Sequence, residues 1–373
     1  MRFDRYHIWQ LLFIGTSSVS LMGQTVIASV NVGLNPSAAD VNPVTDRIYV
    51  TDESSDTVSI LDGKRNTART VSVGEGPFSI AVNPATNKIY VVNYLSSSVT
   101  VIDGETETTS TISVGGGPVA VAVNPKTNKI YVANGGDDSV NIIDGFSNDI
   151  RTVSTANCGA TAIAVDERTN KIYVVGEVSC MTIIDGSTYA TTQVASGTNS
   201  RNLAINPITH KVYVTNQSSD RVTIFDPFSN HTSTIVVGSS PYAVSVNTAT
   251  NKIYVANSES NNVTVIDGAT DKTATVEVGS DPGWEAVDSK LNKIYVSNLD
   301  SGDVTVIDGF TNATSTVSVG YTPKQLVVDP LTHLVYVPNY ESNTVSVIRT
   351  PRCDDSRDWE YHDDHFCSPH GDR

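Results

Sequence analysis

The chain has 373 residues, with 24 Lys and Arg against 40 Asp and Glu, so its formal net charge is −16. Its 17 % of charged residues and its abundance of Val, Thr, Ser, Asn and Gly are typical of strands and turns rather than helices. The 39 % of hydrophobic residues can fill a large core, which excludes disorder for most of the chain. The acidic balance argues against a nucleic-acid partner and against an anionic membrane surface.

Residues 1–23 are predicted to be a secretory signal peptide. Arg2 and Arg5 precede an apolar stretch from Ile8 to Ile14, and small residues follow as far as Gly23. This stretch is too short and too interrupted to span a bilayer, and no later segment approaches 18 apolar residues. We therefore expect a secreted, periplasmic or cell-surface protein without a transmembrane segment.

Residues 24–349 repeat one pattern with a period of about 41 residues. Aspartates recur 41 residues apart at Asp62, Asp103, Asp144, Asp185, Asp226, Asp267 and Asp308. Tyrosines recur at Tyr49, Tyr90, Tyr131, Tyr173, Tyr213, Tyr254, Tyr295 and Tyr336. A period near 40 with strand patterning predicts an all-β fold, a β-propeller with one four-stranded blade per repeat.

The unit that starts at Pro118 shows the parts of a blade. Residues 119–123 alternate Val with Ala and predict an inner strand, and Asn, Pro and Thr in residues 124–128 predict a turn. Residues 129–133 and 139–143 predict the second and third strands, the latter ended by an Asp-Gly turn. A fourth strand near residues 151–154 leads into the next unit. We interpret the repeated Asp-Gly pairs as turn formers rather than as a carboxylate array.

The tetrapeptide Tyr-Val-Thr-Asn at residues 213–216, with close variants at 131–134, 254–257 and 295–298, makes the chain resemble the YVTN family of β-propellers. This repeat type occurs in microbial surface-layer proteins and exported bacterial propellers. The resemblance covers residues 25–349 and implies a propeller at the cell envelope or surface. It says little about chemistry, because propellers carry many functions.

Eight blades are expected. Eight tyrosine strands are present, but only seven are followed by a fourth strand, whereas residues 28–33 match residues 69–74. The N-terminal strand should therefore complete the last blade and close the ring, which removes its open edges. Members of the resembling family are often seven-bladed, so a seven-bladed ring with one displaced unit is the alternative.

Cys158 and Cys180 are predicted to form a disulfide. They lie in two loops on the same face of one blade, and the only two changes of spacing among the repeated landmarks fall in those loops. Such a bond fits export and would contribute about 3 kcal/mol in the chain-entropy model. Two buried free thiols are the alternative.

Residues 350–373 are predicted to be an acidic C-terminal tail. A Cys353–Cys367 disulfide would enclose several Asp residues with His362 and His365, but the spacing matches no standard metal site, so no metal or other cofactor is predicted.

Candidate binding residues are those that depart from the repeat near one mouth of the channel. The position after the loop proline carries Phe78, Arg201, Tyr242 and Lys324, and the next position carries Asn202, Trp284 and Gln325. Aromatic rings with cations are typical of a binding site for a ligand with an anionic group. Farther in, Asp40 and Glu285 replace small or apolar residues, and we expect them to be buried acids that pair or face the channel.

We find no catalytic constellation. Three of the seven histidines lie in the tail and His7 in the signal peptide, while His210, His231 and His333 belong to turns of the face opposite the cysteine loops. The sequence favours a non-enzymatic, monomeric scaffold that binds a protein, a glycan or a small molecule. One alternative is a propeller enzyme of the lyase, lactonase or quinone-dependent dehydrogenase type acting at the mouth. Single-stranded DNA binding, implied by some relatives, is opposed by the net charge.

Overall fold

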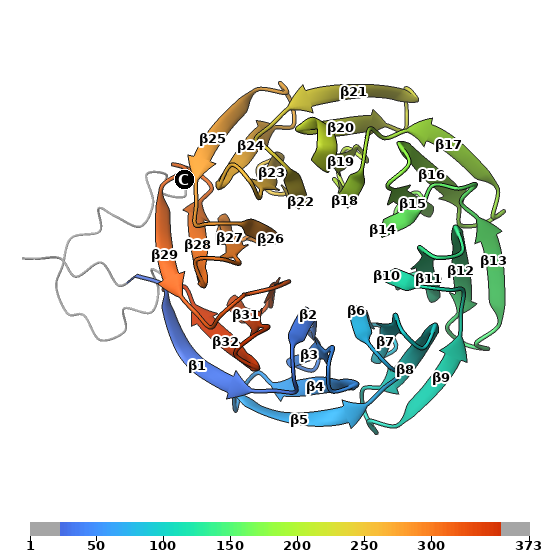
Figure 1. Cartoon of the computed structure of the whole chain (residues 1–373), viewed down its shortest axis with the longest axis horizontal. Helices are drawn as coiled ribbons and strands as arrows, with labels where there is room; N and C mark the ends of the chain where they lie inside the picture. Colours follow the sequence, from blue (N-terminus) through green and yellow to red (C-terminus); the bar gives the residue numbers. More distant parts are fainter. Residues whose placement is uncertain (1–22, 352–373) are drawn as a thin grey trace, which may run out of the picture. The chain divides into compact units, whose positions relative to one another are not determined.

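The computed structural model describes residues 23–351, and residues 24–350 form one compact unit. That unit is a β-propeller of eight four-stranded antiparallel blades arranged in a ring, as predicted (Figure 1). The predicted signal peptide, the tail and the Cys353–Cys367 disulfide lie outside the described residues, except for a few residues at their inner ends. Within residues 23–351, no helix is long and apolar enough to cross a membrane.

Each blade contributes one strand to each of four concentric positions. The innermost strands, in order from blade 1 to blade 8, are β2 (Pro36–Asn42), β6 (Pro77–Asn83), β10 (Pro118–Asn124), β14 (Ala160–Asp166), β18 (Ser200–Ile205), β22 (Pro241–Asn247), β26 (Pro282–Asp288) and β30 (Val327–Val328). The second strands are β3 (Arg47–Asp52), β7 (Lys88–Asn93), β11 (Lys129–Asn134), β15 (Lys171–Gly176), β19 (Val212–Asn216), β23 (Lys252–Asn257), β27 (Lys293–Asn298) and β31 (Leu334–Asn339).

The third strands are β4 (Thr57–Asp62), β8 (Ser98–Asp103), β12 (Ser139–Asp144), β16 (Cys180–Asp185), β20 (Arg221–Asp226), β24 (Asn262–Asp267), β28 (Asp303–Asp308) and β32 (Thr344–Arg349). The outer strands are β5 (Thr67–Ser72), β9 (Thr109–Ser113), β13 (Ile150–Ser154), β17 (Thr191–Ala195), β21 (His231–Val236), β25 (Thr273–Glu277), β29 (Thr314–Ser318) and, in blade 8, β1 (Thr25–Asn31). A short 3-10 turn, η1 (Gln217–Ser219), follows β19.

Two faces of the ring follow from this meander. The loops that join the second to the third strand, and those that join one blade to the next, lie on one side, which we call the mouth face. The turns that join the first to the second strand and the third to the fourth lie on the other, which we call the turn face.

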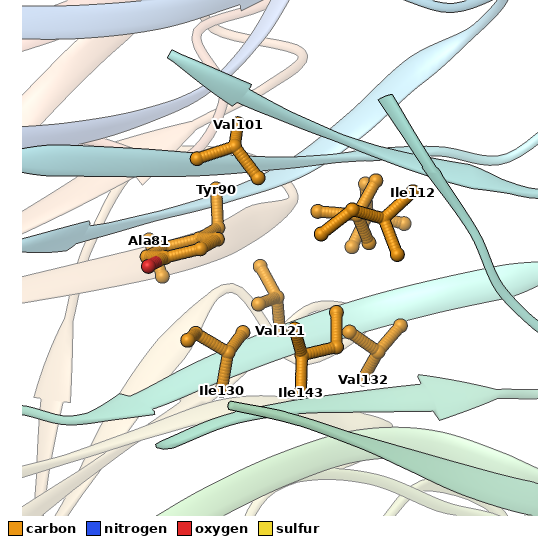
Figure 2. Close-up of a cluster of buried hydrophobic side chains, with 10 residues drawn as sticks. Ala81, Tyr90, Val101, Ile112, Val121, Ile130, Val132 and Ile143 are labelled. Carbon is orange, nitrogen blue, oxygen red and sulfur yellow. The ribbon is translucent and has the colours of Figure 1, made fainter. Parts of the chain in front are cut away.

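The cores lie between neighbouring blades. The second and third strands are buried along almost their whole length, since Val, Ile and Tyr side chains fill both sides of each sheet. Figure 2 shows one such core, where Tyr90 and Val101 of blade 2 face Val121 and Ile130 of blade 3. Each blade therefore needs its neighbours for stability, because the apolar side chains on its faces are covered by the adjacent blades.

The asparagine that ends most second strands has a structural role on the mouth face. Asn93 donates to the Ser98 and Thr100 hydroxyls, at 3.0 and 2.9 Å, and the Gly74 amide donates to Thr100 at 3.2 Å. A Cβ on Gly74 would lie 2.6 Å from the Asn93 amide nitrogen, so the glycine is required for this close approach. In most blades, the repeated Asn, Thr and Gly thus fasten the inter-blade loop to the blade that follows it.

Blade 4 lacks this fastening and carries the predicted disulfide instead. Gly176 takes the place of the asparagine, and a Cβ there would lie 1.9 Å from the backbone oxygen of Cys158. The Cys158–Cys180 disulfide joins the inter-blade loop to the start of β16, with 5.7 Å between the Cα atoms. Within residues 23–351, no free cysteine remains. The covalent bond therefore replaces the hydrogen bonds that an asparagine makes elsewhere.

Ring closure follows the prediction. β1 pairs antiparallel with β32, from Thr25 opposite Arg349 to Asn31 opposite Thr344, so the N-terminal strand completes blade 8 (Figure 1). The ring has eight blades, and the seven-bladed alternative is wrong. The inner strand of blade 8 is short, because Gln325 donates its backbone N–H to Ser37 of blade 1 rather than to its own sheet.

Candidate functional site

A cavity of about 800 Å³ opens at the mouth face. Its wall includes seven of the residues proposed from the sequence, namely Phe78, Arg201, Asn202, Tyr242, Trp284, Lys324 and Gln325. They converge because each sits at the start of an inner strand, immediately after the loop that enters the blade. A binding role for them remains a prediction.

Four side chains form a continuous chain of ring and cation contacts across blades 5 to 8. The Arg201 guanidinium lies 5.1 Å from the centre of the Tyr242 ring, and Tyr242 packs edge-on against Trp284 at 5.3 Å. The Lys324 ammonium then lies 5.2 Å from the Trp284 ring. We call Arg201, Tyr242, Trp284 and Lys324 the cation–aromatic wall. Cation–π and edge-to-face contacts hold these long side chains in place.

Lys324 contacts two rings, since its ammonium also lies 5.1 Å from the centre of the Tyr340 ring. Burial lowers the pKa of Lys324, while the carboxylates of Glu53, Asp281 and Glu341 act in the opposite direction. Among the described residues, neither Lys324 nor Arg201 has a carboxylate within 4.0 Å. In a protein of net charge −16, two cations without an ion pair at one cavity make that cavity suited to an anion.

Blade 3 lines the cavity with small residues. It contributes Gly117, Gly135 and Gly136, while Glu177 lines the cavity from blade 4 and Phe78 and Tyr94 line it from blade 2. A Cβ on Gly136 would lie 2.8 Å from the backbone oxygen of Gly116, so close packing of the loops keeps this side bare. The cavity wall is therefore asymmetric, with the two cations on blades 5 and 8 and with glycines on blade 3.

Sequence reasoning missed Glu53, Tyr94, Glu177 and Tyr340 in the cavity wall. Tyr94 lies 6.3 Å from Phe78, centre to centre, and Tyr340 contacts Lys324. All four follow directly after the last residue of a second strand, a position that varies from unit to unit just as the proposed mouth positions do. Comparing that column of the repeat would have found them.

Asp40 and Glu285 do not pair with each other and are not in the cavity wall. Asp40 accepts hydrogen bonds from the backbone N–H groups of Val41 and Val82, both at 2.8 Å, and so reaches toward blade 2. Glu285 accepts one from Ser245 at 2.9 Å, toward blade 6. They occupy alternating positions of their strands, Asp40 opposite Tyr49 and Glu285 opposite Val296, so their side chains diverge.

Both acids have strongly altered acidity. Burial raises the pKa of Asp40 to about 6, against which its two backbone hydrogen bonds act. Burial raises the pKa of Glu285 to about 8, because one hydroxyl from Ser245 compensates little and the second carboxyl oxygen has no partner. Glu285 is thus largely protonated at neutral pH.

The remaining polar candidates are structural. His210 and His333 each bond to an aspartate of the preceding blade, Asp166 and Asp288, at 2.5 and 2.6 Å. Within residues 23–351, no group of three or more His, Cys, Asp or Glu side chains is placed to hold a metal ion. The fold and its cavity define a β-propeller with a polar, open-mouthed site.

The chain matches the family described as "Lactonase, 7-bladed beta-propeller" over residues 32–232, just over half of its length. It therefore belongs to that family, although its own ring has eight blades. Among solved structures it is similar to a chain of Kuenenia stuttgartiensis hydrazine synthase, with 19 % identity and a TM-score of 0.62, over 85 % of this chain and 96 % of that one. At that identity the likeness shows the fold alone. No curated protein matches the sequence.

Proposed function

We propose that the protein is an exported, non-enzymatic propeller that binds a ligand at the mouth cavity. The observation that carries the proposal is the cation–aromatic wall, in which two cations without an ion pair are held against fixed rings. The predicted signal peptide and the resemblance to YVTN surface-layer propellers support a place in the envelope or outside the cell.

The chemistry of the wall favours a small or medium-sized anion with a flat apolar face. Arg201 and Lys324 would pair with the anionic group, and Tyr242 and Trp284 would cover the flat face. The volume of about 800 Å³ fits the range of small-molecule sites rather than a folded partner. Because the wall is ordered in advance, little conformational entropy is lost on binding.

Binding is testable with Trp284, the only tryptophan among the described residues. Titration of the purified protein with 2-naphthoate and with galacturonate oligomers should change its fluorescence. The Arg201→Ala/Tyr242→Ala/Trp284→Ala variant should lose binding in calorimetry, about 100-fold or more, because it removes the charge and both rings.

The matched control removes three large exposed side chains from the turn face, in the Phe146→Ala/Phe228→Ala/Phe310→Ala variant. These rings are 83, 75 and 78 % exposed, so their loss should leave both fold and affinity unchanged. If the mouth variant keeps full affinity and the turn-face variant loses it, the binding site lies on the turn face and the proposal is wrong.

A second candidate is lactone hydrolysis, supported by the family's description and by the raised pKa values of Asp40 and Glu285. A pH-stat assay on γ- and δ-lactones tests it directly. Turnover that disappears in both Asp40→Asn and Glu285→Gln variants would favour this candidate over the binding scaffold.

A further inference from the structure

A ring of side-chain contacts on the turn face links each blade to the next. The first residue of the inner turn of one blade reaches the last residue of the same turn in the following blade. Five of these contacts are amide pairs with N···O distances of 2.7–2.9 Å, namely Asn42–Asn87, Asn83–Asn128, Asn124–Asn170, Asn206–Asn251 and Asn247–Asn292.

At two further junctions, both asparagines are replaced by another pair of residues. At the junction of blades 4 and 5 the pair is Asp166 with His210, and at blades 7 and 8 it is Asp288 with His333. At both junctions the first residue is an aspartate, and the second is a histidine whose ring N–H can donate a hydrogen bond to it. These seven junctions therefore all place a hydrogen-bond donor against an acceptor.

The eighth junction breaks this rule. Between blades 8 and 1 the corresponding residues are Asp329 and Asp46, two carboxyl groups, and the proximity of Asp329 is one of the causes that raise the pKa of Asp46. Asp329 is fully buried and already accepts from the Leu331 N–H at 2.9 Å and the Thr332 hydroxyl at 2.8 Å. One oxygen of Asp46 is buried without a partner.

The other groups around Asp46 do not neutralise the pair. Asp62 and Lys64 act on it from the β4–β5 turn with opposite signs, and the Tyr336 phenol approaches from β31. Asp62 is itself paired with Arg65 at 2.7 Å. Asp329 is fully buried and Asp46 partly so, and two neighbouring carboxylates there repel each other unless one of them keeps a proton and becomes the missing donor.

We propose that Asp46 and Asp329 share one proton in the folded ring. They would then form a pH-dependent hydrogen bond between blades 8 and 1, where the ring closes. With the proton, the O–H of one carboxyl donates to the other, as the amide does at five other junctions. Without it, the last and first blades repel each other. The junction is therefore tightest in acid and loosens as the pH rises.

The raised pKa of Asp46 determines the direction in which stability changes with pH. Burial and the neighbouring Asp329 raise the pKa of Asp46 in the folded state. Its contribution to stability is fully present below the ordinary aspartate pKa of 3.8, and it is lost as the pH rises through the raised value. Because many other acids also titrate, only the difference between two variants isolates this pair.

The test compares the full chain with the Asp46→Asn variant by thermal unfolding from pH 4 to pH 8, after treatment with EDTA. The asparagine supplies a permanent donor to Asp329, so the variant should melt about 2 °C or more above the wild type at pH 8. At pH 4 the two should coincide, because the wild type then carries its own proton. The matched control is Asn87→Asp, where Asn42 remains the donor and no new pH dependence is expected.

A second variant places a pair of carboxyl groups at another junction, between blades 7 and 8. His333→Asp places a second acid against Asp288, and it should lower the melting temperature at pH 8 relative to His333→Asn while matching it at pH 4. A difference between wild type and Asp46→Asn that does not vary with pH would overturn the proposal. So would a rise in the wild-type melting temperature with 2 mM Ca²⁺ that Asp46→Asn abolishes, because the pair would then hold a cation rather than a proton.

Discussion

Single residues that depart from the repeat carry most of the information about this protein. Where a position of the repeat is nearly constant, as with the asparagine that ends six of the eight second strands, the side chain fastens a loop to its blade. Where it varies, the residues either face the cavity, as Trp284 does, or meet a partner that has changed with them, as His210 meets Asp166. A residue that departs from the repeat is therefore a candidate site residue only if it does not form a structural pair with another residue that departs from the repeat.

Glu285 gives a prediction at this scale. Its pKa of about 8 means that the folded protein binds a proton that the unfolded chain releases near 4.5, so its contribution to stability declines as the pH rises from 4.5 through 8. Glu285→Gln removes the titration and keeps a carbonyl that can accept from Ser245. The difference in melting temperature, variant minus wild type, should rise by several degrees as the pH increases from 5 to 9. A constant difference over that range would contradict the burial of this carboxyl group.

At the scale of elements, each inter-blade loop is fastened to the blade that follows it, and blade 4 shows that the means can change. The loss of the asparagine at Gly176 coincides with a shorter path to β16 and with the Cys158–Cys180 bond. Both loops border the cavity through Gly159 and Glu177. The disulfide therefore stabilises the wall of the candidate site as well as the blade.

Removal of this disulfide should cost about 3 kcal/mol of stability, because it frees a 22-residue loop in the unfolded chain. The Cys158→Ser/Cys180→Ser variant should unfold at a clearly lower urea midpoint than the wild type. Reducing agent should lower the midpoint of the wild type but not that of the variant. As a comparison, Asn134→Gly removes the asparagine from blade 3 without supplying a disulfide, and its midpoint should fall regardless of reductant. Equal midpoints for all three proteins would show that neither fastening matters.

For the whole molecule, the decisive contact is between the two ends of the described chain. The first paired positions of β1 and β32, Thr25 and Arg349, are 324 residues apart in the sequence, yet the two strands form one continuous edge of blade 8. Closure leaves no blade without neighbours on both sides, so the ring needs no capping element. The acid pair at the same junction would place a pH-sensitive contact beside that closure.

Deletion of residues 25–31 tests closure. Without β1, the edge of β32 has no partner, and the apolar side chains of β32 lose their cover. The truncated protein should aggregate or lose ten degrees or more in melting temperature, which light scattering and calorimetry can measure. Truncation of residues 352–373, outside the described ring, is the control and should change the melting temperature little. Unchanged stability after deletion of β1 would contradict closure by this strand.

The sequence by itself determined the propeller, and it predicted the eight blades, the closing strand and the Cys158–Cys180 bond against the alternatives of seven blades and free thiols, between which the structure decided. Each of these depends on spacing along the chain, and a repeat converts spacing directly into position in the ring. It also indicated the mouth positions, because these fall at a fixed place in every unit.

Only the tertiary structure decided which side chains meet. The contacts of Lys324 with both Trp284 and Tyr340, and the divergence of Asp40 and Glu285 toward different blades, depend on strand pleat and on the angle between neighbouring blades. The opposition of Asp46 and Asp329 joins blades 1 and 8, whose turns lie 283 residues apart. A repeat fixes where a residue stands in its own unit, but its neighbour across the junction comes from another unit, and three-dimensional packing brings the two together.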